Sequence, residues 1–340
     1  MPLPRTAASD TFSAPATPGI PCVAAACPLC DSAGPHPVLL EVRRLSPFNT
    51  ADSPPCHIDV VRCDRCGMLR LDPRPDDPTL ALLQRDRIGD SDREVGSLET
   101  GNSNPDYPPM LARRLQEAGF PGSGGRLLDV GCGSGDLLAG VASLLGATAT
   151  GLDVSEPALE RARRGFPAHT WVRAAAEPEA LPREAFDAAT LIHVLEHSPM
   201  PVALLATLRS WLRPDGILVV EVPNGEFYFS RFYSIFLESP KPQIGAVLRS
   251  LGRRVPFTAR GFYPYHLSLF GPDSLRAMAE KAGFEVLSVE MSTCRLQWWL
   301  KENRRRREWS RYFINKIKLA LARRGLGDNL FLVARRPASP

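Results

Sequence analysis

The feature that most constrains the fold is a glycine-rich segment that follows a short apolar run. It reads Leu127-Leu128-Asp129-Val130-Gly131-Cys132-Gly133-Ser134-Gly135-Asp136. Glycine lets the backbone turn sharply and approach a ligand closely, so a strand that ends in Gly-x-Gly-x-Gly and opens a helix is typical of a βαβ unit. The segment therefore predicts a parallel sheet with a ligand site at the carboxyl end of this strand.

The rest of the C-terminal two thirds of the chain alternates between strand and helix patterns. Strands are expected at 126–130, 148–154, 170–174, 186–193, 216–222, 285–291 and 328–335, and helices at 136–145, 156–164, 202–212 and 274–282. Such alternation predicts an α/β fold with a seven-stranded, mostly parallel sheet and helices on both faces.

Two acidic residues, Asp136 and Asp153, indicate which class of ligand the glycine-rich segment binds. Asp136 stands where a dinucleotide fingerprint needs a small residue, and no Gly-Lys-Ser/Thr follows, so a pyrophosphate ligand is disfavoured. Asp153 ends the next strand, 22 residues after Gly131, where an acid can accept both ribose hydroxyls of a nucleoside. A nucleoside without phosphates fits, and S-adenosylmethionine (SAM) meets that description.

Residues 126–224 resemble the class I SAM-dependent methyltransferases, which have a Rossmann-like fold. The first motif is 127–135, the second is 151–155, and the turn at 212–216 is similar to the family's "LkPGG" turn. The resemblance implies that Asp153 and Val154 hold the nucleoside and that Glu177 meets the adenine edge. It also implies that the methionine end is cradled by Asp129, Gly131, Cys132, Gly133 and Gly135.

A second motif, His193-Val194-Leu195-Glu196-His197, follows the fourth strand of the predicted sheet. If helical, His193, Glu196 and His197 share one face and could bind a divalent metal, supply a general base, or merely line the pocket. The motif is similar to the metal-binding Glu-x-x-Glu-His of ubiquinone-pathway O-methyltransferases and of enzymes that 2′-O-methylate small RNAs. That likeness implies a fourth member, His266. Because His193 replaces the first Glu, the motif disfavours a hard, oxygen-seeking ion such as magnesium.

Four of the eight cysteines form two Cys-x-x-Cys pairs near the N-terminus, namely Cys27, Cys30, Cys63 and Cys66. Four thiolates in two such pairs can surround one ion tetrahedrally, and zinc is favoured over iron. The gap of 32 residues between the pairs is longer than in a usual zinc ribbon. The resulting prediction is a structural zinc-ribbon-like module, with the other four cysteines as free thiols.

These patterns predict the domain organisation. We expect a disordered leader (1–20), the zinc-ribbon-like module (21–78), a linker with helices (79–125) and the SAM-binding domain (126–340). The linker is expected to begin in the Pro-rich stretch 72–78. Two insertions are expected in the last domain, an acceptor lid at 226–262 and a basic amphipathic helix within 292–326. No signal peptide or membrane span is recognisable, so a cytoplasmic location is expected.

The sequence is compatible with three functions. The first is methylation of a small-molecule acceptor, most simply a hydroxyl of a sugar, lipid-like compound or secondary metabolite. The second is RNA methylation, with the zinc module and the basic helix holding phosphates. The third is a non-enzymatic module whose basic helix, residues 298–324, makes peripheral membrane or partner contact. A formal net charge of +4 does not separate them, and the oligomeric state is not indicated.

Overall fold

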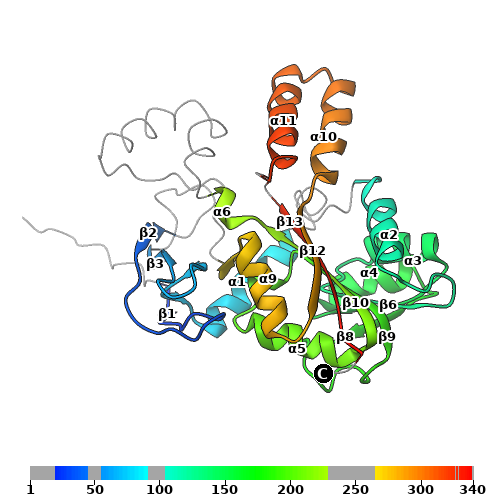
Figure 1. Ribbon diagram of the computed structural model, residues 1–340, viewed down its shortest axis with the longest axis horizontal. Coiled ribbons are helices and arrows are strands. Elements are labelled where there is room, and N and C mark those ends of the chain that lie inside the picture. The colour runs from blue at the N-terminus through cyan, green and yellow to red at the C-terminus, as the bar shows by residue number, and fades with distance from the viewer. Residues whose placement is uncertain are drawn as a thin grey trace, which may run out of the picture.

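The computed structural model describes residues 20–44, 55–90, 104–228, 265–325, 327 and 329–338. Its centre is a seven-stranded sheet with the order β12-β13-β10-β9-β6-β7-β8 (Figure 1). The strands are β6 (Arg126–Val130), β7 (Thr148–Asp153), β8 (Thr170–Arg173), β9 (Phe186–Ile192), β10 (Leu212–Pro223), β12 (Glu285–Met291) and β13 (Asn329–Arg335). Pairs from β8 to β10 are parallel, whereas β13 is antiparallel to both neighbours. The predicted Rossmann-like sheet is confirmed.

Helices cover both faces of this sheet. They are α2 (Tyr107–Glu117), α3 (Asp136–Leu145), α4 (Glu156–Gly165), α5 (Pro201–Trp211) and α9 (Pro272–Lys281). Leu127 shares a buried cluster with α2, α3 and α4, whereas Leu128 shares the other cluster with α5 and α9. Successive strand residues point to opposite faces, so the near-continuous apolar run of β6 is what a two-sided sheet requires.

The N-terminal module is built on a second, antiparallel sheet. Its order is β11-β4-β3-β2, with β2 (Val38–Arg44), β3 (Pro55–Arg62), β4 (Leu69–Leu71) and β11 (Ser268–Leu269). A separate pair joins β1 (Cys22–Val23) to β5 (Arg74–Pro75), and α1 (Asp77–Asp90) follows. Residues 72–78 are therefore not a linker, because β5 and the start of α1 fold back onto the module.

Strand β11 belongs to the larger domain in sequence but to the module's sheet in space. Ser268 pairs with Arg70, and the Leu71 N–H donates to the Leu267 carbonyl at 3.0 Å. Leu267 and Leu269 lie in one buried cluster with residues of β3 and β4. The module and the larger domain thus share both a sheet and a core.

The basic segment near the C-terminus forms two helices, α10 (Cys294–Arg305) and α11 (Trp309–Ala322), which pack against each other. The expectation of one continuous helix over 298–324 is wrong. Arg307 adopts a left-handed conformation with φ of 58°, which ends the helical path between them. The expected lid at 226–262 lies almost wholly outside the described residues, apart from the short helix α6 (Gly225–Tyr228). No helix in the described ranges is long and apolar enough to span a membrane.

Candidate functional site

The glycine loop leaves β6 in a conformation that only glycine adopts without strain. Gly131, Gly133 and Gly135 all have positive φ, at 77°, 54° and 80°. A Cβ at Gly131 would lie 2.4 Å from Val194 Cγ2, and one at Gly135 would lie 2.3 Å from the Trp171 ring. A Cβ at Gly133 would meet nothing within 4 Å. The outer glycines are thus required by packing, and the middle one presents bare backbone to open space.

Asp153 ties this loop to the end of β7. Its Oδ2 accepts the Gly133 N–H at 2.8 Å, and its Oδ1 accepts the Ser155 N–H at 2.8 Å. Each carboxylate oxygen keeps a further acceptor direction for a hydroxyl. Val154, next in the chain, is 57% exposed despite its apolar side chain. An open backbone loop, a bidentate acceptor and an exposed apolar residue fit the ribose and base of SAM.

Asp129 lies at the end of β6 on the face covered by α2 and α3, and only 4% of it is exposed. Burial raises the pKa of its carboxyl to about 7; the hydrogen bond from Thr190 Oγ1, at 2.6 Å, opposes this, and the charge of Asp153 adds to it. A buried carboxylate of this kind is stabilised by a cation. The sulfonium and ammonium groups of SAM have the required charge.

Two predicted cofactor residues have less distinctive surroundings. Cys132 is buried, and burial raises the pKa of its thiol, so only its backbone is suited to ligand contact. Glu177 is exposed beyond β8, where its N–H donates to the Ala175 carbonyl. The adenine-edge role of Glu177 stays a prediction.

The His-Glu motif does not form an α-helix. His193 has φ of 55°, and Leu195–His197 make a single 3₁₀ turn, η2. Even so, His193 Nδ1 lies 3.5 Å from Glu196 Oε1, and His197 Nε2 lies 3.9 Å from the same atom. Val194, between them, packs against the glycine loop at Gly131. The motif therefore lies directly beside the loop suited to SAM.

His266 completes the group from the segment before β11. Its ring centroid is 4.8 Å from that of His197, and one ligand atom from each of Glu196, His197 and His266 lies within 4.8 Å of the others. The His197 Nδ1 is 2.9 Å from the Tyr265 carbonyl, which can only accept. Nδ1 therefore carries a proton, and in the neutral form of the ring the Nε2 lone pair lies on the side of Glu196.

Glu196 is the unusual member, because only 1% of it is exposed and neither carboxylate oxygen has a hydrogen-bond partner among the described residues. Burial alone would raise its pKa, but His197, His193 and His266 together lower that pKa to about 2. A buried carboxylate that stays ionised requires a nearby cation. Protonated imidazoles or a metal ion held by Glu196, His197 and His266 would each meet that requirement.

The four paired cysteines converge as a metal site requires. Cys27 Sγ lies 3.5 Å from Cys66 Sγ, and Cys30 Sγ lies 3.5 Å from Cys63 Sγ. All four sulfurs are within 4.8 Å of one another. Tetrahedral Zn²⁺ with Zn–S bonds of about 2.3 Å places its sulfurs about 3.8 Å apart. The donor set and its spacing fit zinc.

A buried acid that the residue pattern did not reveal lies beside the His-Glu motif. Glu221 of β10 is 1% exposed and accepts a hydrogen bond from the Tyr107 hydroxyl of α2. Its carbonyl accepts the His193 N–H at 2.8 Å, so it adjoins the His-Glu motif. The acid stands within the apolar run 217–222, and this unusual position could have marked Glu221 as a buried polar residue. Its partner Tyr107 could not have been predicted, because no residue pattern in α2 points to Glu221. His36, near Cys63 and Asp64, was also missed.

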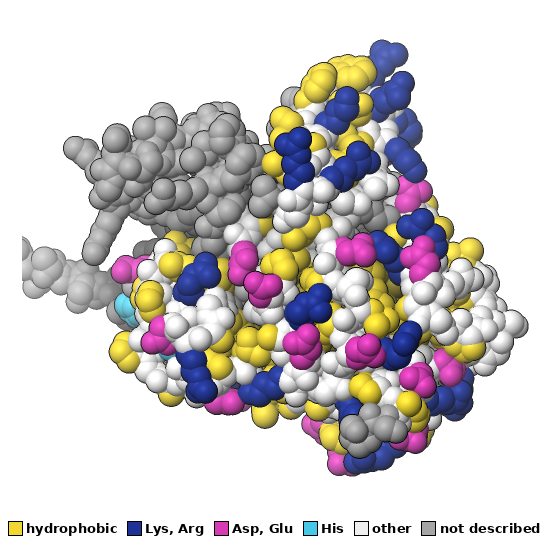
Figure 2. Space-filling view, viewed as in Figure 1, with side chains coloured by type: hydrophobic (Ala, Val, Ile, Leu, Met, Phe, Trp, Pro, Cys, Tyr) yellow, Lys and Arg dark blue, Asp and Glu magenta, His cyan; other side chains and the backbone are white. Residues whose placement is uncertain are grey.

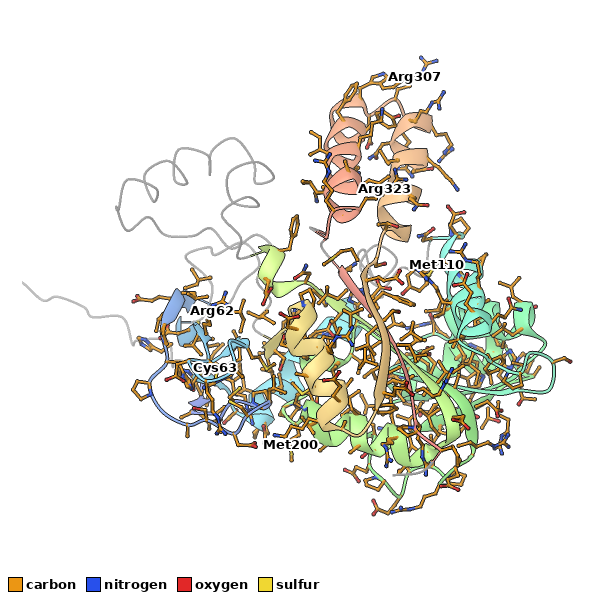
Figure 3. The ribbon with its side chains drawn as sticks, in the orientation of Figure 1. Arg62, Cys63, Met110, Met200, Arg307 and Arg323 are labelled. Carbon is orange, nitrogen blue, oxygen red and sulfur yellow. The ribbon has the colours of Figure 1, made fainter. Side chains whose placement is uncertain are left out.

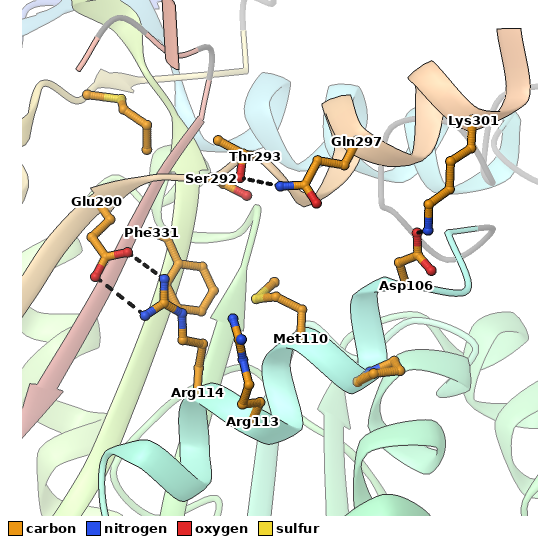
Figure 4. Close-up of a pocket in the computed structure, with 12 residues that line it drawn as sticks. Asp106, Met110, Arg113, Arg114, Glu290, Ser292, Thr293, Gln297, Lys301 and Phe331 are labelled. Carbon is orange, nitrogen blue, oxygen red and sulfur yellow. Dashed lines mark hydrogen bonds and ion pairs between the residues drawn. The ribbon is translucent and has the colours of Figure 1, made fainter. Parts of the chain in front are cut away.

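A pocket of about 370 Å³ lies between α2, the end of β12 and the start of α10 (Figure 4). Met110, Met291 and Phe331 give it apolar walls, Arg113 adds a positive charge, and Lys301 is paired with Asp106 at 2.6 Å. Strand β12 is parallel to β10, so its carboxyl end lies at the same edge of the sheet as the glycine loop. The pocket is thus on the ligand-binding edge.

Known proteins resemble this chain over much of its larger domain. Residues 106–289 match a family described as "Methyltransferase domain". The ubiquinone biosynthesis O-methyltransferase of Bordetella bronchiseptica is 32% identical over 184 residues, which cover 52% of this chain and 69% of that protein. The namesake from Thiobacillus denitrificans is 29% identical over 195 residues, covering 54% and 76%. Haemonchus contortus phosphoethanolamine N-methyltransferase 2, solved with SAM, superposes with a TM-score of 0.49 at 18% identity, covering 79% of this chain and 63% of that one.

Proposed function

Because this chain belongs to the class I SAM-dependent methyltransferases, whose domain it matches over residues 106–289, we propose that it methylates a hydroxyl oxygen of a small-molecule acceptor. The observation that carries the proposal is the cluster of Glu196, His197 and His266, which lies beside the SAM loop. The names of the O-methyltransferase relatives favour oxygen as the accepting atom. The apolar walls of the pocket beside α2 favour an acceptor with an apolar part.

In the proposed reaction, Asp153 and the bare backbone of Gly133 hold the nucleoside, and Asp129 faces the positive end of SAM. The acceptor oxygen attacks the methyl carbon in line with the C–S bond. The C–S electron pair returns to sulfur, and S-adenosylhomocysteine leaves. The sulfonium is already activated, so positioning supplies much of the rate enhancement.

The hydroxyl proton passes to His197 Nε2 in this scheme. The Tyr265 carbonyl fixes the tautomer that leaves this lone pair available. Glu196, ionised and 3.9 Å away, stabilises the imidazolium that forms. His193 and His266 complete the charge balance around the same carboxylate.

Glu196, His197 and His266 also suit a divalent ion, which would supply Lewis-acid activation of the acceptor hydroxyl. Two imidazoles and one carboxylate suit zinc or iron better than magnesium, which prefers oxygen ligands. Both versions use the same residues and differ in whether a chelator stops turnover.

The experiment follows radiolabelled methyl transfer from SAM to a panel of phenols, catechols, sugars, hydroxylated lipids and RNA. We expect transfer to a hydroxylated small molecule, and loss of transfer with retained SAM binding in His197→Ala. His57→Ala is the matched control, because His57 is exposed on β3, which belongs to the other sheet. Transfer only to RNA or only to nitrogen, or full turnover in His197→Ala, would contradict the proposal.

We further propose that Cys27, Cys30, Cys63 and Cys66 hold one structural zinc ion. The supporting observation is the sulfur spacing, because two 3.5 Å pairs in a partly buried site match a tetrahedral thiolate shell. Elemental analysis of protein purified without chelator, set against protein dialysed with chelator, measures this directly. About one equivalent that is lost together with part of the folding stability is the expected result.

A further inference from the structure

Helices α10 and α11 form a hairpin that stands away from the central sheet (Figure 1). The start of α10 contacts α2 and lines the pocket with Gln297 and Lys301. The turn at Arg307 is the distal tip of the hairpin, and Arg323 follows the end of α11 nearer the sheet (Figure 3). Of this hairpin, the proposed methyl transfer uses only the start of α10, at the pocket, and neither it nor the cysteine site uses α11 or the turn at Arg307.

One face of α11 exposes large apolar side chains. Trp309, Phe313 and Ile317 are 53%, 58% and 53% exposed, and their spacing of four residues places them along one stripe. Among the exposed large hydrophobic residues of the described chain, Trp309 and Phe313 are the only aromatic ones. Three such side chains on one projecting helix form a surface that water solvates poorly.

The formal positive charge of the hairpin exceeds the net charge of the whole chain. Residues 294–325 contain eight Arg and three Lys against two Glu, a formal charge of +9, whereas the whole chain carries +4. The remainder is therefore acidic overall. Arg304, Arg305, Arg306 and Arg307 lie at the tip, and Lys316 adjoins the apolar stripe. Basic side chains cluster on the hairpin in Figure 2.

We propose that the hairpin docks on an anionic lipid surface, with Trp309, Phe313 and Ile317 entering the headgroup region and the basic residues meeting lipid phosphates. An aromatic and aliphatic stripe flanked by Arg and Lys is the composition of interfacial amphipathic helices. A nucleic acid would also bind the basic residues through its phosphates, but it would leave Ile317 and part of the apolar stripe exposed to water. A second copy of this chain would bring another +9 against the first, which disfavours pairing through this face.

The hairpin is joined to the pocket through α10, because Gln297 and Lys301 at the start of this helix line the pocket. The docking itself does not depend on the acceptor, so it is tested without turnover.

The test is co-sedimentation of the full-length, metal-loaded protein with vesicles. One set contains phosphatidylcholine with the anionic lipid phosphatidylglycerol, and the other contains phosphatidylcholine alone. We expect binding to the anionic vesicles that falls with added salt, because exposed charges are screened. Each Lys or Arg near an anionic surface changes the partition coefficient by a factor of about five. Arg304→Gln with Arg307→Gln should therefore weaken binding roughly tenfold or more.

Trp309→Ser with Phe313→Ser should also weaken binding, by at least about tenfold, while leaving SAM affinity unchanged. The matched apolar control is Leu144→Ser on α3, where Leu144 is 55% exposed. The matched charge control is Arg164→Gln with Arg183→Gln, both exposed and outside the hairpin. Equal binding to both vesicle types, or unchanged binding in the Trp309 and Phe313 variant, would overturn the proposal. So would a preference for single-stranded RNA that vesicles do not displace, or a dimer that the apolar substitutions dissociate.

Discussion

Asp129 offers the sharpest test of the cofactor site, because its buried carboxylate should make the protein without SAM less stable as the pH rises. Its pKa lies at about 7 instead of near 3.8, mainly because burial disfavours the ionised form. The native state therefore holds a proton that the unfolded chain has already released between these values. Stability falls with rising pH across that window and levels off above about pH 7.

The size of the effect follows from the two pKa values. Each pH unit between them is worth about 1.4 kcal/mol, so the full interval amounts to about 4 kcal/mol. Asp129→Asn removes the titration but keeps the shape and an oxygen that can accept from Thr190. We expect the variant to match the natural protein near pH 4 and to exceed its stability by up to about 4 kcal/mol above pH 7.

The assay is urea unfolding of SAM-free protein from about pH 5 to about pH 8.5, with the variant and the natural protein measured side by side. Their difference cancels the titrating groups that do not interact with Asp129, including Glu196. Asp273→Asn, at an exposed position at the start of α9, controls for the substitution itself. In parallel, SAM affinity of the natural protein should rise by up to tenfold per pH unit below about pH 7 and should not do so in Asp129→Asn.

A stability difference that stays constant across the pH range would show that Asp129 is not buried in the way described. A difference that varies with pH while SAM affinity does not would keep the burial and reject the role of Asp129 toward the SAM cation. The stability measurement therefore tests the burial of Asp129, and the affinity measurement tests its proposed role in SAM binding.

Three further predictions address the other parts of the site. Asp153→Ala should weaken SAM binding at least tenfold by calorimetry, because lost charge-assisted hydrogen bonds are worth about 1.5–3 kcal/mol each; unchanged affinity in a folded variant would reject the site. Cys63→Ser should lose the bound metal by elemental analysis and destabilise the N-terminal module, whereas Cys56→Ser, which alters a cysteine outside the four, should retain the metal. If Glu196, His197 and His266 bind a metal, a chelator that leaves the cysteine site loaded should stop turnover and a divalent ion should restore it; indifference to the chelator would leave His197 as the base.

The central sheet could be predicted because its signals are local. The glycine loop, the apolar runs and the acid at 153 each sit within a few residues, and β6, α3 and β12 begin and end where the patterns indicate. The period of the hydrophobic residues and the turn residues at each end are enough to predict such an element, because its buried face shows directly in its own sequence. The SAM-binding class follows from that same local context.

The parts that could not be predicted depend on contacts between distant segments. His193 reaches Glu196 through a left-handed turn and a 3₁₀ turn, whereas helical spacing suggested one face of a helix. The buried pair of Tyr107 and Glu221 joins residues 114 positions apart, and no residue pattern links them. The break at Arg307 is also invisible to periodicity, because arginine is a good helix former and neither glycine nor proline marks the turn.

The position of β4 suggests how the N-terminal module contributes to the candidate active site. The Cys63 N–H donates to the Met68 carbonyl, and Met68 is buried beside β4, which pairs with β11 two residues after His266. On the other side, Lys281 Nζ donates to the Leu29 carbonyl at 2.8 Å, which ties the first cysteine pair to α9. Metal binding that contributes folding free energy to the module would therefore also fix His266 against the cluster. The glycine loop and Asp153 lie on β6 and β7, which belong to the other sheet, so loss of the metal should impair methyl transfer more than SAM binding.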